Sequence, residues 1–300
     1  MKIKRMDLDG TGSPMGLVTK ILKIENDLPI PVPIEELAQQ LDIEKIADLE
    51  TPGFEGGLVT DTERSTGFIL VNGQARDGRR RFTIGHELGH FLIISHAPVE
   101  PGKFLCSRVD MTTWSAEQNN RHARMEAEAN EFSALILMPP PVLQKFISKE
   151  RDPNLAHIPL VAKHFCVSKE AAARSYTRYH DQNIAIAVLK DGIVRRIHKG
   201  PRFPWITARH GKPAPQSSIV HRKDLTKRIA SEVVSTLPDN WIDVQFGQRA
   251  PELYEQVYPQ QNGYALLMLW IEMPEDDEEF DPDDNRTSKQ RLQYRESKWR

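Results

Sequence analysis

The segment His86-Glu87-Leu88-Gly89-His90 carries the side chains best suited to chemistry in this chain of 300 residues. Four residues of helix turn the chain by about 400° and rise about 6 Å, so His86 and His90 point the same way from adjacent turns. Two imidazole nitrogens at this spacing can occupy two corners of a zinc tetrahedron. Glu87 is rotated by about 100° from His86 and can reach a water molecule at the metal without binding the metal itself. The pattern predicts a hydrolytic zinc site with Glu87 as its general base.

A catalytic zinc site takes three protein ligands and keeps a fourth position open, so a third ligand must come from elsewhere. The predicted helix 121–138 offers Glu126, Glu128 and Glu131. Relative to the apolar side of this helix, Glu126 lies nearest the edge, Glu128 lies farther round and Glu131 lies opposite. We predict Glu126 as the third ligand, with Glu128 as the alternative. Asn130, one turn after Glu126, is suited to accept a hydrogen bond from the second nitrogen of a ligating histidine and to fix its tautomer.

The elements that must position these residues follow from hydrophobic periodicity. The helix around the histidines, about 83–95, is apolar nearly all round, which is typical of a buried central helix. Before it, short extended segments separated by glycines predict a small, mostly antiparallel sheet over 46–71. Residues 97–120 look irregular, and three prolines at 139–141 end the helix that carries Glu126. Three shorter helices are predicted at 142–148, 158–165 and 168–179.

The pattern changes near residue 184. Two strand-like segments flank Asp191-Gly192, a strong hairpin signal, and are followed by a predicted helix at 223–236 and strands at 241–246 and 264–272. Trp205, Trp241 and Trp270 are expected in the core of this second unit. We predict an α+β protein with these parts: an N-terminal extension (1–28), a domain that carries the predicted zinc site (29–183), a smaller α+β domain of unknown role (184–273) and a charged, solvated tail (274–300).

Composition narrows the class of protein. Hydrophobic residues make up 39% of the chain and charged residues 27%, as in soluble globular proteins. The formal net charge of −2 gives no overall basic field for DNA or anionic lipid. The longest apolar segment, 264–271, is far shorter than the roughly 20 residues of a membrane span, and no secretory signal is expected at the start. Two cysteines, 60 positions apart, suit a reducing cytoplasm, so we expect a cytoplasmic location.

Two segments resemble the ImmA/IrrE family of zinc metallopeptidases: RRFTIGHELGHFLI (80–93) and EAEANEFSALILMP (126–139). The resemblance extends over about residues 29–180. It implies a zincin-like domain in which His86, His90 and Glu126 hold Zn²⁺ and Glu87 acts on water. It also implies a protein substrate, a helix-turn-helix repressor of the XRE type. The chain departs from the family in a longer segment between His90 and Glu126, in Ser133 where the family has alanine, and in an unmatched C-terminal third.

The sequence is compatible with two functions. The first is a zinc metallo-endopeptidase that makes a regulated cut in a protein partner. The second is a non-catalytic, zinc-bearing binding protein, antitoxin-like or anti-repressor-like, that acts stoichiometrically. An intact Glu87 favours the enzyme, because a structural zinc site needs no base. Direct nucleic-acid binding is disfavoured, since the helix-turn-helix-like segment 160–179 has few basic residues, and we expect it to have a packing role.

Other residues have weaker predictions. An oxyanion donor is expected, and the candidates that the sequence does not rank are His122, Arg124, Tyr176 and Tyr179. Cys106 could approach the zinc, but we predict a small buried hydrophobic residue. The arginines at 79–81 could contact an acidic substrate, but we predict an exposed strand end.

Overall fold

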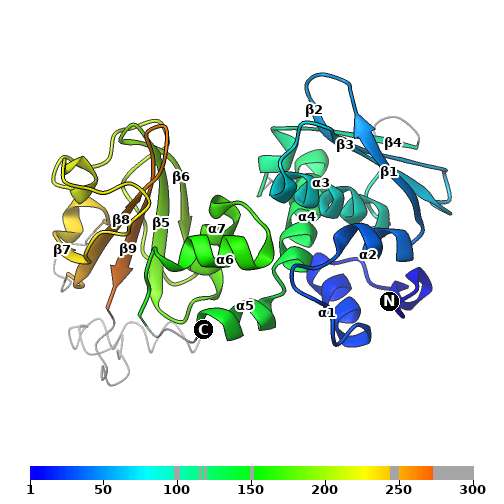
Figure 1. The fold of residues 1–300 in the computed structure, drawn as a ribbon, viewed down its shortest axis with the longest axis horizontal. Coiled ribbons are helices and arrows are strands. Elements are labelled where there is room, and N and C mark those ends of the chain that lie inside the picture. The colour runs from blue at the N-terminus through cyan, green and yellow to red at the C-terminus, as the bar shows by residue number, and fades with distance from the viewer. Residues whose placement is uncertain (98–101, 115–116, 118–119, 149–151, 244–249, 273–300) are drawn as a thin grey trace, which may run out of the picture.

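The computed structural model describes residues 1–97, 102–114, 117, 120–148, 152–243 and 250–272. These residues form two β-sheets at opposite ends of the molecule, with helices beside the first sheet and between the two (Figure 1). The predicted α+β class is confirmed. No helix in the described residues is long and apolar enough to cross a membrane. The predicted tail, 274–300, lies outside the described residues.

The first sheet has four strands in the order β1-β3-β2-β4, namely β1 (Ile43–Leu49), β3 (Gly67–Asn72), β2 (Phe54–Thr60) and β4 (Lys103–Ser107). β2 pairs antiparallel with both of its neighbours, whereas β1 runs parallel to β3. The prediction of a small, mostly antiparallel sheet holds. The prediction that residues 97–120 are irregular was wrong for β4, whose five residues have too short an alternation to be recognised in isolation.

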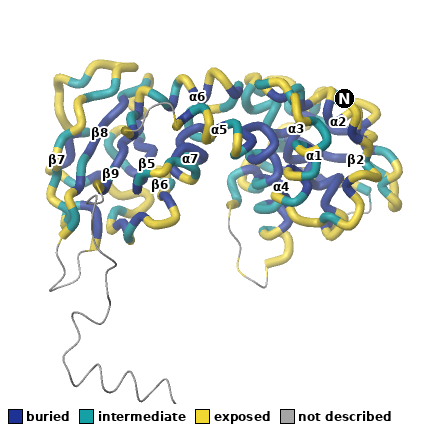
Figure 2. Tube along the Cα trace, turned by 90° about the horizontal axis from the view of Figure 1, so that it is seen from below, coloured by how far each residue is buried: buried dark blue, intermediate teal, exposed yellow. Residues whose placement is uncertain are grey.

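Four α-helices complete this half: α1 (Pro14–Ile24), α2 (Ile34–Gln40), α3 (Asp77–Leu92) and α4 (Arg121–Leu137). Helices α2 and α3 contact the sheet, α4 packs on α3, and α1 packs on α4. Their shared core includes the fully buried Leu17, Leu37, Leu88 and Phe132. Leu17 belongs to α1, so this helix, which lies within the predicted N-terminal extension (1–28), is part of the same core. In Figure 2 the buried segments form one group around α3 and α4 and another along β5, β8 and β9.

Helix α3 is the centre of the first half, and it begins earlier than predicted. It runs from Asp77 to Leu92, so the arginines at 79–81 lie in its first turns, and their prediction as an exposed strand end was wrong. Two of its glycines allow a close approach to α4. A Cβ atom at Gly85 would lie 2.7 Å from Ser133 Oγ, and one at Gly89 would lie 3.2 Å from Ala129 Cα. Ser133, where the chain departs from the family, donates a hydrogen bond to the Phe82 carbonyl across this contact.

The middle of the chain forms three helices close to their predicted positions: α5 (Pro140–Ile147), α6 (His157–Phe165) and α7 (Lys169–Tyr179). Ser168 caps α7, since its side chain accepts a hydrogen bond from Ala171 N. The buried residues Phe165 and Tyr176 join these helices to β5 in a second apolar core. The helix-turn-helix-like segment therefore has the packing role that was predicted.

The second sheet is antiparallel, with strands in the order β6-β5-β9-β8-β7: β6 (Ile193–Lys199), β5 (Asn183–Lys190), β9 (Tyr264–Ile271), β8 (Leu253–Pro259) and β7 (Val234–Thr236). The predicted hairpin is present, because Asp191 and Gly192 both have positive φ (52° and 74°) as a two-residue type I′ turn requires. Four short 3-10 helices complete the described elements: η1 (Arg5–Leu8), η2 (Asp110–Thr112), η3 (Ile219–His221) and η4 (Pro238–Asn240).

Two predictions in this C-terminal unit were wrong. Residues 223–236 form no helix. Part of this segment lies along the edge of the sheet, where Val234 pairs with Glu255 and Ser231 N donates to Val257 O. The β-branched Val233 and Val234 fit this strand-like backbone better than a helix.

The predicted strand at 241–246 is also absent from residues 241–243, the part that the structure describes. Ile242 makes only an isolated bridge to Ile206. Trp241 is fully buried, as expected, and donates a hydrogen bond to Glu255. Trp270 is half-buried, and Trp205 is 72% exposed, so the expectation that Trp205 belongs to the core was wrong.

Candidate metal centre

Four side chains that can donate to a metal meet in the interior of the first half: His86 and His90 from α3, Glu126 from α4 and Cys106 from β4. One donor atom of each lies within 4.8 Å of the others, and all four residues are buried. His86 Nε2 lies 3.1 Å from His90 Nε2 and 3.2 Å from Glu126 Oε2. His90 Nε2 lies 3.5 Å from Glu126 Oε1 and 3.7 Å from Cys106 Sγ.

These separations fit a tetrahedral zinc site. Bonds of about 2.0–2.1 Å to nitrogen or oxygen give tetrahedral edges of about 3.3 Å, and a bond of about 2.3 Å to sulfur lengthens the edge to about 3.6 Å. The nitrogen and oxygen atoms are spaced at 3.1–3.5 Å, with Glu126 Oε2 facing His86 and Oε1 facing His90, and the sulfur lies 3.7 Å from His90 Nε2. Imidazole, carboxylate and thiolate are also the ligand types that zinc takes in proteins. The residues present therefore fit the metal that the sequence predicted.

Asn130 settles the tautomer of His86. Its Nδ2 donates to the carbonyl oxygens of Asp110 and Thr113, at 2.8 and 2.7 Å, so Oδ1 must be the atom that faces His86. Oδ1 lies 2.9 Å from His86 Nδ1 and accepts its proton. The lone pair of His86 then lies on Nε2, which points into the donor cluster. This is the place that the sequence predicted for Asn130.

His90 is held by a second chain of hydrogen bonds. Its Nδ1 lies 2.9 Å from His96 Nδ1, and His96 Nε2 lies 2.9 Å from Glu128 Oε2. Glu128, the alternative third ligand, thus lies beside His96 and not in the donor cluster. Glu131 pairs with Arg178 at 3.0 Å on the surface. His96 had no role in the sequence analysis, although a third histidine six residues after the motif was a signal that could have found it.

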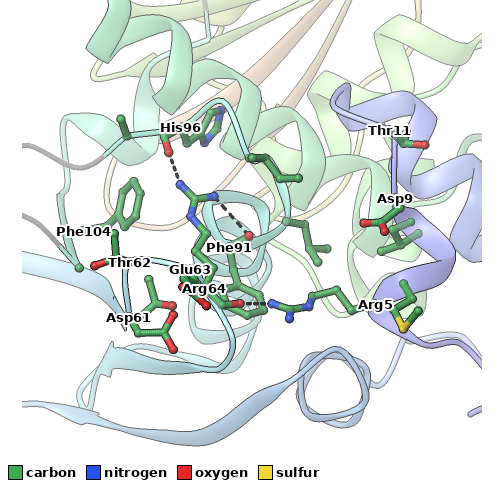
Figure 3. A pocket seen from close by; sticks show the side chains of 17 residues that line it. Arg5, Asp9, Thr11, Asp61, Thr62, Glu63, Arg64, Phe91, His96 and Phe104 are labelled. Atoms are coloured by element: carbon green, nitrogen blue, oxygen red, sulfur yellow. Dashed lines mark hydrogen bonds between the residues drawn. The ribbon is translucent and has the colours of Figure 1, made fainter.

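The end of α3 is fixed by Arg64, from the loop after β2. Its guanidinium group donates to the carbonyl oxygens of His90 and Ile93, both at 2.9 Å, and to that of His96. Figure 3 shows this side chain inside a pocket of about 580 Å³ that is also lined by Phe91, His96 and Phe104. The hydrogen bonds satisfy carbonyl groups that a helix C-terminus leaves unpaired, and so position His90 and His96 together.

Glu87 lies beside the donors. Both of its carboxylate oxygens are buried, and no N–H or O–H group of the described residues hydrogen-bonds to them. A Cβ atom at Gly56 would lie 2.7 Å from Glu87 Oε1, so β2 can approach this carboxylate closely only with a glycine at that position. Burial raises the pKa of Glu87 to about 8, although His86 and the Cys106 thiol act to lower it. A divalent cation on the neighbouring donors would also lower this pKa.

The other ionisable groups of the cluster are strongly perturbed. Burial lowers the pKa of His90 to about 3, so its imidazole is neutral and able to ligate. Burial acts to raise the pKa of Glu126, but the adjoining imidazole rings of His86 and His90 outweigh burial and lower the pKa. Burial raises the pKa of the Cys106 thiol well above its usual range. Metal binding at this cluster must therefore release protons.

Of the four candidate oxyanion donors, the structure brings only His122 to the site. His122 Nδ1 lies 3.8 Å from Glu126 Oε1, and its side chain is 55% exposed. Arg124 is exposed. Tyr176 is fully buried in the second core, where its hydroxyl accepts a hydrogen bond from Asn154 N. Tyr179 is half-buried and packs against both cores.

Cys106 is buried, as predicted. It also lies among the metal donors, so it is a candidate ligand and not only a small hydrophobic residue. It lies opposite Gly56 in the pairing of β4 with β2, which brings the strand across the metal cluster. The position of this strand could not be predicted from the sequence, because the residues around it show no long run of alternating polar and apolar side chains.

Residues 45–177 match the family model Peptidase M78, described as the IrrE N-terminal-like domain. No curated protein matches the chain. Among solved structures, a Mycobacterium tuberculosis transcriptional regulator is similar over 79% of this chain and 69% of its own, with 15% sequence identity and a TM-score of 0.48.

Proposed function

We propose, from the premise that residues 45–177 belong to the peptidase M78 family with its IrrE N-terminal-like domain, that this chain is a zinc-dependent metallo-endopeptidase. In this proposal, His86, His90 and Glu126 hold the metal, and Glu87 is the catalytic base. The proposed catalytic domain spans residues 29–183. Family membership and a buried donor cluster support a protease-type hydrolase, and the catalytic assignment of each residue is our proposal.

The observation that carries the proposal is the position of Glu87. It follows the ligand His86 directly, it is fully buried beside the donor cluster, and it is not one of the four clustered donors. A structural zinc site needs no such group, because four ligands complete it. A hydrolytic site needs a carboxylate that can take a proton from water next to the metal.

When bound, zinc supplies a Lewis acid for the scissile carbonyl and lowers the pKa of water to about 7. Glu87 accepts one proton of the attacking water as the oxygen bonds to the carbonyl carbon. It then delivers that proton to the leaving nitrogen as the carbon–nitrogen bond breaks. Asn130 holds His86 in the tautomer that keeps Nε2 free. His122, in its imidazolium form with Nε2–H on Asp110 Oδ1 at 3.2 Å, is our proposed donor to the developing oxyanion through Nδ1.

The substrate that we propose is a helix-turn-helix repressor of the XRE type, in the cytoplasm. Support comes from the resemblance of residues 29–180 to the ImmA/IrrE family. The net charge of −2 gives the chain no overall positive field that would attract nucleic acid, so we propose that it acts on the repressor protein itself. The cut is proposed to be regulated, because the donor cluster is shielded from solvent in this conformation: His86, Glu87 and His90 are 0% exposed and Glu126 is 2% exposed.

Cys106 favours a second candidate, the non-catalytic zinc protein. With its thiolate, the cluster supplies four protein donors, and a site closed by four protein ligands is characteristic of structural zinc. In the enzyme, Cys106 must leave the metal so that substrate and water can reach it. The two functions therefore differ in whether the cysteine is an exchangeable or a permanent fourth donor.

The test is to mix the purified, zinc-loaded chain with purified helix-turn-helix repressors of the XRE type from the same genome and to analyse the products by mass spectrometry. We expect a defined pair of fragments that disappears when a chelator removes the metal and returns when zinc is added. Stable complex formation without fragments would support the binding protein and overturn the enzyme. A second sample with Cys106→Ala shows whether the cysteine alone prevents cleavage.

A further inference from the structure

A second pocket lies one helical turn from the metal centre and is lined mainly by positive charge. It has a volume of about 290 Å³ and is enclosed by α3, η2, the C-terminal end of α4, α7 and β6. We call it the arginine pocket. Its cationic lining consists of Arg79, Arg108, Arg174 and Arg196, and its apolar lining includes Phe82, Met111, Trp114, Leu137 and Met138.

Two of the four guanidinium groups have no acidic partner in the part of the chain that the structure describes. Arg196 pairs with Glu170 at 2.6 Å, and Arg79 pairs with Glu55 at 3.4 Å. Within the described residues, neither Arg108 nor Arg174 has a carboxylate oxygen within 4.0 Å. Arg174 lies instead against the ring of Trp114.

The arginine pocket therefore has four positive groups against the single carboxylate of Glu170, in a chain whose net charge is −2. Local charge of this kind, next to apolar walls that exclude water, favours an anionic ligand.

The arginine pocket shares a wall with the metal centre. Phe82 lies one turn before His86 on α3, with the ring centroids 6.4 Å apart, and Trp114 lies 6.1 Å from Phe82. Asn130 links the two sites, because it binds His86 and also the carbonyl oxygens of residues 110 and 113, which adjoin the lining residues Met111, Thr112 and Trp114 in the chain. An extended peptide rises about 3.3 Å per residue, so a side chain two or three residues from a bond at the metal can reach the pocket.

The larger pocket of Figure 3 is less suited to an anion. Arg64 uses its guanidinium group on backbone carbonyls, and Arg5 pairs with Asp42 at 2.9 Å and also donates to the Arg64 carbonyl. The lining also contains Asp9, Asp61 and Glu63. Cations without an acidic partner, next to the metal centre, are thus a feature of the arginine pocket.

We propose that the arginine pocket binds an acidic side chain of the protein substrate, two or three residues from the bond that is cut. This inference rests on the proposed peptidase function for its purpose. Arg108 and Arg174 bind the carboxylate, since a guanidinium group can hold both of its oxygens, and the apolar lining packs against the methylene groups of the same side chain. Of the arginines at 79–81, only Arg79 lines the pocket; Arg80 pairs with Glu35 and Asp48, and Arg81 donates to Val32 O.

The first test measures binding separately from cleavage. The zinc-loaded Glu87→Gln chain is titrated with two fluorescein-labelled decapeptides of alanine and glycine that carry either three glutamates or three glutamines. Fluorescence anisotropy should show at least tenfold tighter binding of the glutamate peptide, weakening as salt rises. The Arg108→Gln/Arg174→Gln double variant should lose this preference. Equal affinity for the two peptides, or a preference that survives the double variant, would overturn the inference.

A matched control keeps the total charge change the same. Arg195 and Arg209 are exposed and do not line the pocket, so Arg195→Gln/Arg209→Gln should keep the preference. Thermal unfolding checks that each variant is folded. If the Arg174 change disrupts folding, the exposed Arg108→Gln alone should weaken binding of the glutamate peptide. Loss of the preference in the control as well would mean that general charge, and not this pocket, selects the peptide.

The second test uses cleavage. The wild-type chain is incubated with a mixture of peptides of random sequence, and the cut sites are identified by mass spectrometry. We expect aspartate or glutamate enriched two or three residues from the cut bond, and no enrichment with the arginine double variant. Cleavage without acidic preference would overturn the pocket inference and leave the peptidase proposal intact. Acid-selective binding with no cleavage of any peptide or repressor would contradict the peptidase proposal and leave the pocket inference intact.

Discussion

Nδ1 of His90 lies 2.9 Å from Nδ1 of His96, and only one of these two nitrogens can carry a proton. His96 Nε2 faces Glu128 Oε2 at 2.9 Å, which places the proton of His96 on Nε2. His96 Nδ1 is then the acceptor, and His90 must donate from Nδ1. The lone pair of His90 is left on Nε2, the atom nearest Glu126 and Cys106. Together with Asn130 on His86, this relay presents both Nε2 atoms to one metal ion.

The relay predicts that Glu128 tunes metal affinity although it does not bind the metal. Glu128→Gln should weaken zinc binding by about 10- to 100-fold, because partners of ligating histidines have effects of this size. Zinc affinity is measured by competition with a coloured chelator. Glu131→Gln, on the surface side of the same helix, should leave the affinity unchanged. An unchanged affinity in Glu128→Gln would contradict the relay.

The position of Cys106 predicts that its removal opens the site. Cys106→Ala should retain one zinc per chain through the three remaining donors and should cleave faster than the wild type. With Co²⁺ in place of zinc, the wild type should show thiolate-to-metal charge-transfer absorption that this variant lacks. Cys166→Ala, in the turn after α6, is the control for loss of a thiol. A cysteine variant that loses both zinc and cleavage would instead support a structural four-ligand site.

The contact between α3 and α4 predicts a stability effect. A methyl group at Gly85 would lie 2.7 Å from Ser133 Oγ and 3.2 Å from Ser133 Cβ, so the helices must move apart. Gly85→Ala should lower the free energy of unfolding by about 1–3 kcal/mol, as overpacking in a core does. Urea unfolding of the metal-free protein measures this. Gly12→Ala is the control, since a Cβ atom there meets nothing within 4 Å. Equal stability of the two variants would show that the helices are not in tight contact.

The lowered pKa of Glu170 should make the stability of the fold depend on pH. Burial acts to raise its pKa, but His198 and Arg196 outweigh burial and lower the pKa from 4.5 to about 2. A lowered folded-state pKa stabilises the protein above pH 4.5, and the contribution is lost as the pH falls from 4.5 toward 2. Glu170→Gln should therefore destabilise by no more than about 1 kcal/mol at pH 7, because the pair is partly exposed, and by less at pH 4. Chemical unfolding at both pH values tests this; a larger effect at pH 4 would contradict the assignment.

The sequence predicted the part of the site that depends on helical spacing. His86, Glu87 and His90 follow from one turn of helix, and Glu126 and Asn130 follow from the apolar side of a long helix, so these positions needed no tertiary information. Cys106 and His96 could not be placed in this way. Each reaches the site through a short or irregular segment, and its position depends on pairing with β2 or on the Arg64 hydrogen bonds.

In the fold, too, the features set by local sequence were predictable, and those set by tertiary contacts were not. Long periodic helices and the Asp191-Gly192 turn were predictable, because local propensity and tertiary structure agree there. The helix expected at 223–236 does not form, because pairing with β8 outweighs a weak local helical pattern. The strand β4 was missed because five residues between irregular segments show too little alternation.

The most direct test of the central claim compares the wild type with Glu87→Gln, each holding one zinc per chain, in single-turnover cleavage of the repressor. Removing the general base while keeping the ligands should slow cleavage by at least about 100-fold with bound zinc unchanged. A Glu87→Gln variant that cleaves within about threefold of the wild-type rate would contradict the proposed role of this carboxylate and the mechanism built on it.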